Sequence, residues 1–167
     1  MNNKLEWSWN YIQEFVTIEL VQELFRRVNC IGSDNCFFLA FTNNQSPKAA
    51  MSGMVGGMIA ASENRAWDAY LINATENGIG ILPLGNKNPL FLKLENLNPQ
   101  LEHFMFFYNN DIEFVKIRRL NFISPVAKSL QIKLKNGIKY NLVVKNKEKK
   151  LPYHQDNFSK FVSKYKN

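Results

Sequence analysis

Two cysteines and two histidines are the side chains of this 167-residue chain best suited to metal binding or to a disulfide. Cys30 and Cys36 lie close together in CIGSDNC, so they could form a disulfide or supply half of a metal site. Structural zinc usually takes four ligands, and His103 and His154 are far away in sequence without ligand-like spacing. We therefore expect reduced, structural thiols, no metal and no other cofactor.

Catalytic motifs are missing as well. The chain has no nucleophile elbow, no HExxH and no Ser/His/Asp arrangement of a known type. GMVGG has the wrong spacing for a dinucleotide loop and lacks the Lys and Ser/Thr of a phosphate loop. Asp111 and Glu113 are interpreted as solvated charges, and both histidines as structural, His154 through a hydrogen bond near the last helix. We expect no catalytic residues, and hence a protein that is not an enzyme.

One apolar stretch, KAAMSGMVGGMIAAS, stands out because residues 49–61 carry no charge. Ser46 and Pro47 would begin a helix well, as N-cap and first helical residue. A helix over 47–61 would be about 22 Å long, short of the roughly 30 Å of a hydrocarbon core. Its methionines would share one face and two of its glycines would form a groove: Met51, Met54 and Met58, with Gly53 and Gly57.

Three interpretations of this stretch stay open. It could pack back on the domain as a structural flap, with methionines filling irregular gaps. It could form a contact surface for another chain or subunit, where the glycines allow close approach. It could also insert shallowly into a membrane, although it has no Lys/Arg-rich polar face of its own.

The formal net charge of +7 is unevenly distributed. Residues 1–110 hold 7 basic and 10 acidic side chains, whereas residues 111–167 hold 14 basic and 4 acidic ones, giving −3 and +10. The basic half could attract anionic lipid, nucleic acid or an acidic protein, or could simply keep a β surface soluble. Lys133, Lys139 and Lys145 are the candidate contacts. Nucleic acid is disfavoured, because no stacking aromatics are interleaved with these lysines.

The remaining composition favours one domain in the cytoplasm. No window reaches the roughly 18–20 apolar residues of a membrane span. The beginning, MNNKLEWSWNY, has no apolar core or cleavage site of a signal peptide. A hydrophobic content of 46% is enough for a substantial core.

Helical patterns occur at both ends of the chain, with short strands between them. Phe15, Ile18, Val21, Leu24 and Val28 form one apolar stripe, which predicts a helix over 10–28. DNFSKFVSKYKN predicts a closing helix with Asp156 or Asn157 as N-cap. Strand signals recur between them, from CFFLAFT to LQIKLKNGIKYNLVV.

The last of these segments allows its register to be derived. A two-residue Asn-Gly turn would mix the apolar and polar faces of the hairpin. A three-residue loop, 135–137, instead pairs Leu134 with Ile138 and Ile132 with Tyr140, with Gly137 in the left-handed conformation. One face is then core, and the other presents Lys133 opposite Lys139.

This order of elements resembles the pleckstrin-homology-like barrel, particularly the bacterial pleckstrin-homology (GRAM-like) domains. The resemblance rests on FFLAFT, AYLINATENGIGILPL, LQIKLKNGIKYNLVV and NFSKFVSKY. It implies an α+β, mainly β fold: an antiparallel barrel of about seven strands over 36–165 with a C-terminal capping helix. Residues 1–30 would be an N-terminal helical extension and 47–61 an apolar insertion. The region between the first two strands offers only Lys48 and Arg65, which argues against the phosphoinositide binding of some relatives.

What the resemblance implies for function is a non-catalytic binding module. We expect protein–protein interaction or self-association through the apolar stretch. The alternative is peripheral binding to anionic membrane lipids through the basic C-terminal half and the Met-rich stretch. No small-molecule substrate is inferred.

Overall fold

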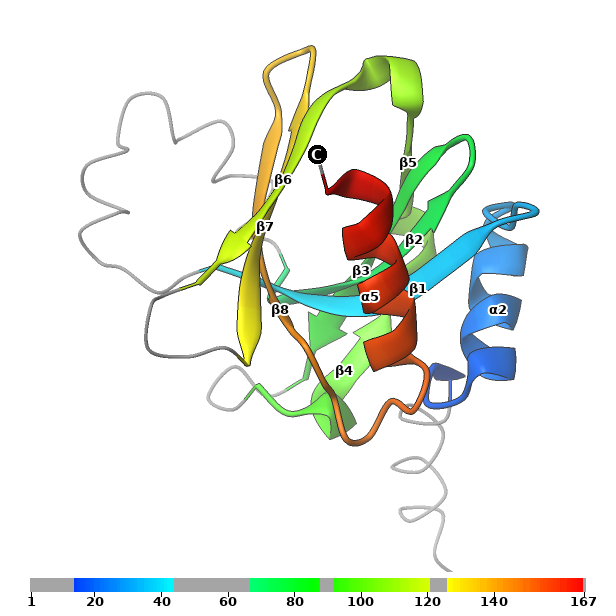
Figure 1. Cartoon of the computed structure of the whole chain (residues 1–167). Helices are drawn as coiled ribbons and strands as arrows, with labels where there is room; N and C mark the ends of the chain where they lie inside the picture. Colours follow the sequence, from blue (N-terminus) through cyan, green and yellow to red (C-terminus); the bar gives the residue numbers. More distant parts are fainter. Residues whose placement is uncertain (1–13, 44–66, 88–91, 121–125, 167) are drawn as a thin grey trace, which may run out of the picture.

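Eight antiparallel strands and two α-helices make up the part of the chain that a computed structural model describes, residues 14–43, 67–87, 92–120 and 126–166 (Figure 1). The α-helices are α2 (Ile18–Arg27) and α5 (His154–Tyr165). The strands are β1 (Asn35–Thr42), β2 (Ala69–Thr75), β3 (Gly78–Asn86), β4 (Leu97–Pro99), β5 (Met105–Tyr108), β6 (Ile112–Arg119), β7 (Ala127–Leu134) and β8 (Lys139–Lys145). Three short 3-10 helices are η2 (Leu94–Asn96), η3 (Leu101–His103) and η4 (Asn109–Asp111).

The strands form one open antiparallel sheet in the order β4-β3-β2-β1-β8-β7-β6, and β5 also pairs with β3. The mainly β, antiparallel prediction is confirmed, with eight strands in place of about seven. The sheet curls, so that side chains of β5 meet β8: the rings of Phe107 and Tyr140 lie 5.8 Å apart, and the Tyr140 hydroxyl lies 3.7 Å from Met105 Sδ.

The central strands are buried on both faces because they carry apolar residues at consecutive positions. All seven residues of β2 are buried. Alternate side chains of a strand point to opposite faces. In β1, Phe38 therefore packs against α5, with ring centroids 5.1 Å from Phe158 and 4.7 Å from Phe161. Phe37 faces the other way and lies 5.5 Å from Phe25 of α2.

Helix α2 begins later than the sequence pattern predicts. Thr17 has extended backbone, and its hydroxyl accepts a hydrogen bond from Leu20 N at 3.3 Å, so it caps the helix. Residues 14–17 are consequently not α-helical. The inward face is formed by Val21, Leu24 and Phe25. Val21 and Leu24 belong to the predicted stripe, so that prediction is confirmed for the central part of the stripe.

The prediction for the N-cap of the closing helix is wrong. Helix α5 begins at His154 after Tyr153, so Asp156 and Asn157 lie in its first turn. The Asn157 side chain instead accepts a hydrogen bond from Phe37 N at 3.0 Å and donates one to Tyr153 O at 2.9 Å. This residue ties the helix to β1, and that role could not be read from the helix alone.

The hairpin of β7 and β8 has the predicted register. Ile132 pairs with Tyr140 and Lys133 with Lys139, while Leu134 N donates to Ile138 O at 2.8 Å. Gly137 has a φ of 95°, the left-handed conformation that the three-residue loop requires. The prediction that Lys133 lies opposite Lys139 is confirmed.

Candidate binding face

Strands β6, β7 and β8 present cations on the surface that faces away from α5. Leu130 and Ile132 are buried in the core beside Phe158 of α5, so the alternate residues of β7 point outward. The outward side chains, here called the basic face, are Phe114, Lys116, Arg118, Ser129, Gln131, Lys133, Lys139, Asn141, Val143 and Lys145.

Strand register arranges these residues in rows across the sheet. One row contains Phe114, Lys133 and Lys139, and the next contains Lys116, Gln131 and Asn141. Neighbouring strands are about 4.8 Å apart, and alternate residues of one strand about 6.6 Å apart. Lys133 and Lys139 therefore lie side by side, and Lys116 lies one row away from them.

The face has more positive than negative charge. Glu113 lies 3.0 Å from Lys133 Nζ, and their side chains are 43% and 33% exposed. Lys116 Nζ lies 4.2 Å from the centre of the Phe114 ring, and Lys133 Nζ lies 5.7 Å from it. These are cation–π distances. Lys116 and Arg118 are exposed and make no ion pair with the described residues.

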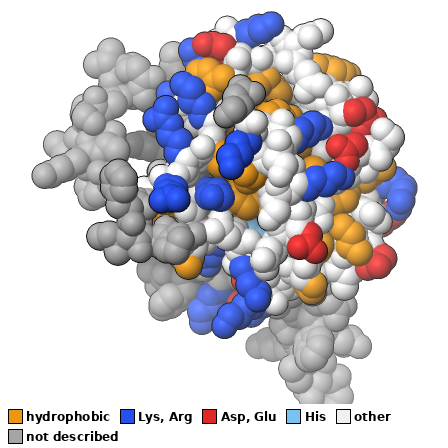
Figure 2. Space-filling model, viewed as in Figure 1, with side chains coloured by type: hydrophobic (Ala, Val, Ile, Leu, Met, Phe, Trp, Pro, Cys, Tyr) orange, Lys and Arg blue, Asp and Glu red, His pale blue; other side chains and the backbone are white. Residues whose placement is uncertain are grey.

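Like charges directly opposite each other on an antiparallel pair are destabilising. Lys133 and Lys139 occupy such a pair. The fold therefore keeps these two cations close together, with Glu113 as an anion beside Lys133. In the view of Figure 2, Lys and Arg side chains lie mainly on the side of β6 and β7, and acidic ones mainly on the opposite side.

Lys145 belongs to the same face but lies at its far end. It is six residues along β8 from Lys139, which corresponds to about 20 Å. Its Nζ lies 5.5 Å from the Phe41 ring centre and 3.6 Å from Glu148. The structure thus brings together two of the three predicted lysines, Lys133 and Lys139, and separates the third.

An open groove of about 690 Å³ lies beside Lys145. Its described lining includes Phe41, Leu92 and Leu94 as apolar residues. Lys145 pairs with Glu148, and Lys150 with Glu95, so two of the cations around the groove already have anionic partners. The groove is therefore less free to bind an anion than Lys116 and Arg118 of the basic face, which make no ion pair with the described residues.

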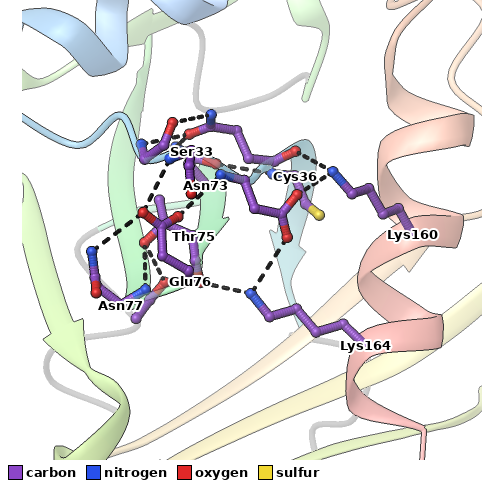
Figure 3. Close-up of polar contacts among 12 residues, drawn as sticks. Ser33, Cys36, Asn73, Thr75, Glu76, Asn77, Lys160 and Lys164 are labelled. Carbon is purple, nitrogen blue, oxygen red and sulfur yellow. Dashed lines mark hydrogen bonds and ion pairs between the residues drawn. The ribbon is translucent and has the colours of Figure 1, made fainter.

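A second polar cluster joins α5 to the residues just before β1 and to the turn between β2 and β3 (Figure 3). The Glu76 carboxylate accepts hydrogen bonds from Ser33 N at 3.0 Å and Asp34 N at 3.1 Å, which lower its pKa to about 2. Lys160 bonds to Asp34 and thereby lowers the pKa of that carboxyl. Lys164 donates to Thr75 O at 2.7 Å. The charges of this cluster are balanced and its groups bonded, so it serves as a clamp between helix and sheet.

The buried thiols and His154 are also structural. Cys30 and Cys36 are free and pack in different cores, on opposite faces of the sheet, as the expectation of reduced thiols requires. His154 Nδ1 accepts from Leu39 N at 3.1 Å, and its Nε2 lies 2.6 Å from Lys145 O, which agrees with the predicted structural role. Burial lowers the pKa of His154. Among the described residues, no group of three acidic, His or Cys side chains could hold a metal ion.

Of the predicted site residues, those of the Met-rich stretch lie outside the described residues: Met51, Gly53, Met54, Gly57 and Met58. The sequence-based reasoning missed Phe114, Lys116 and Arg118 of β6. The alternating pattern of IEFVKIRR already indicated that these three side chains share one face of a strand. What was missing was the pairing of β6 with β7, which puts them on the same face as Lys133.

Comparison with protein-family models yields no match, and comparison with curated proteins yields no significant relative. In the described part of the chain, none of the helices combines the length and apolar character needed to cross a membrane.

Proposed function

We propose that this protein is a non-catalytic binding module of pleckstrin-homology-like fold. Three features support the fold assignment: the antiparallel strands, their curled sheet and the C-terminal helix packed on β1. A binding role is supported by the basic face, because its cations outnumber its anions and point outward.

The partner we propose is an acidic surface of another protein. The observation that carries this proposal is the exposure of Lys116 and Arg118 beside the neighbouring Lys133 and Lys139, because neither Lys116 nor Arg118 forms an ion pair with the described residues. A complementary negative surface would relieve their repulsion and would speed association at low salt. The large exposed hydrophobic residues, such as Tyr108 and Leu92, are not gathered on this face. A polar, charged surface without large exposed hydrophobic residues suits a protein partner of complementary charge better than insertion into lipid.

The proposal is tested by fluorescence anisotropy with a labelled poly-glutamate peptide. The variant Lys116→Glu/Arg118→Glu removes charge from the face, and Lys147→Glu/Lys149→Glu changes the net charge equally on an exposed loop after β8. We expect binding that weakens with salt and becomes about tenfold weaker in the first variant only, since surface pairs contribute about 0.2–1 kcal/mol each. Equal weakening in both variants, or no binding by the wild type, would contradict the proposal.

Peripheral binding to anionic membranes is a second candidate. It is favoured by five cations on one sheet face, since each basic residue near an anionic surface contributes about 1 kcal/mol. Co-sedimentation with phosphatidylserine-containing vesicles, compared with phosphatidylcholine alone, distinguishes it from the protein partner. Salt-sensitive pelleting with phosphatidylserine but no poly-glutamate binding would favour the membrane. No pelleting at low salt would exclude it.

Self-association through the Met-rich stretch stays a prediction, because this stretch lies outside the described residues. The Gly53→Leu substitution would block close approach of a second chain. Solution mass measured for this variant and for the wild type tests the prediction. A monomer in both cases would exclude self-association through these residues.

A further inference from the structure

Strand β6 ends the sheet. It pairs with β7 along Ile112–Arg119, and the order of strands gives it no neighbour on its other side within the described residues. An edge strand offers backbone N–H and C=O groups to another extended chain. At eight residues, β6 is also long for an edge that is to remain unpaired.

The two faces of β6 differ in chemistry. Lys116 and Arg118 point outward with the basic face. Val115 and Ile117 point the other way and pack against the core that α5 covers. A strand added beside β6 would therefore meet cations on one of its faces and aliphatic side chains on the other.

The aliphatic side of this edge is incompletely covered. Helix α5 contacts β6, yet Val115 and Ile117 are only half-buried, as is Val162 of α5. Figure 2 shows hydrophobic side chains at the surface near β6 and α5, with Lys and Arg around them. A further apolar side chain placed beside Val115 and Ile117 would remove more of this surface from water.

We propose that the edge of β6 accepts, as an added strand, an extended segment of a partner protein in which acidic and aliphatic residues alternate. The acidic side chains would lie beside Lys116 and Arg118, and the aliphatic ones beside Val115 and Ile117. Backbone hydrogen bonds would fix the register, and the alternation would decide which face of the segment points outward. The inference rests on the proposed function, because it specifies the acidic partner and how that partner binds.

The test uses a capped, labelled peptide as long as β6, eight residues, with Val and Glu in alternation. Two further peptides carry N-methyl groups, one on every Glu amide and the other on every Val amide. Their charge and their number of methyl groups are equal, but in an added strand only one of the two sets of amides faces β6. All three are titrated against the wild type and against Lys116→Glu/Arg118→Glu.

We expect one methylated peptide to bind about as well as the parent and the other to bind at least about tenfold more weakly, because it loses the hydrogen bonds to β6. Hydrogen exchange should slow at alternate amides of β6 when the parent peptide binds. If the two methylated peptides bind equally well, and this binding is lost in Lys116→Glu/Arg118→Glu, strand addition is overturned and the proposed function stands. Unequal binding that persists unchanged in the charge variant would support strand addition but contradict the role of the basic face. No binding of any acidic peptide would overturn both.

Discussion

Replacing Asn73 by Leu should strongly destabilise the protein. The Asn73 side chain is fully buried between β1 and the loop that follows α2. Its Oδ1 accepts a hydrogen bond from Cys36 N at 3.1 Å, and its Nδ2 donates to Cys30 O at 2.8 Å and to Asn35 Oδ1 at 3.0 Å. Leu has a similar size but can replace none of these bonds.

The expected loss follows from the groups that remain behind. The substitution leaves Cys36 N–H and Cys30 C=O without the partner that Asn73 provides. A buried polar group left unsatisfied costs about 1–3 kcal/mol, and the gain from burying the Leu side chain offsets part of this. We therefore expect the free energy of unfolding to fall by about 3 kcal/mol. With an m-value of about 2 kcal/mol/M, the urea midpoint would decrease by about 1.5 M.

The assay is urea unfolding followed by circular dichroism, with Asn141→Leu as the matched control. Asn141 is exposed on β8, where its Oδ1 accepts a hydrogen bond from Gln131 at 2.7 Å. That substitution should change stability by no more than about 0.5 kcal/mol. The reasoning would be refuted if Asn73→Leu cost less than about 1 kcal/mol, or if both variants lost the same amount.

Three further predictions concern stability and reactivity. Burial lowers the pKa of His154 below 6.5, so the unfolded chain takes up a proton that the folded protein does not. The free energy of unfolding should therefore fall as the pH drops below about 6.5. In urea titrations, His154→Gln should flatten this dependence between about pH 7 and 5. An equal slope in the variant would contradict this. Gly78→Ala should lower the free energy of unfolding by about 3 kcal/mol in the same assay, because the new Cβ would lie 2.1 Å from Phe107 O and force β3 and β5 apart. Wild-type stability in this variant would show that the contact relaxes. Burial raises the pKa of the Cys30 thiol to about 12 and also raises that of Cys36. A thiol-reactive dye should therefore label them only as the protein unfolds. Rapid labelling of either thiol under native conditions would be incompatible with their burial.

Local patterns were sufficient to predict several elements. The β7–β8 register follows from alternating residues and the loop chemistry at Gly137, both of which are contained in one short segment. The cores of α2 and α5 follow from helical periodicity in the same way. Phe158 and Phe161, for example, are three residues apart and face the same core.

What could not be predicted depends on contacts between distant segments. The true start of α5 could not be inferred because Asn157 bonds to Phe37, 120 residues earlier. Phe114 and Lys116 join the basic face only through pairing across the segment that connects β6 to β7. Sequence alternation indicates that such residues share a face of one strand, but it does not reveal which strand lies beside it.

The most direct test of the basic face is to map where an acidic peptide binds. Titration of the isotope-labelled protein with poly-glutamate, followed by amide NMR spectra, reports the location independently of any substitution. The account predicts the largest shifts in β6, β7 and β8, around Lys116, Lys133 and Lys139, and their disappearance at high salt. Shifts centred instead on the groove around Leu92 and Lys150, or on α5, would contradict it.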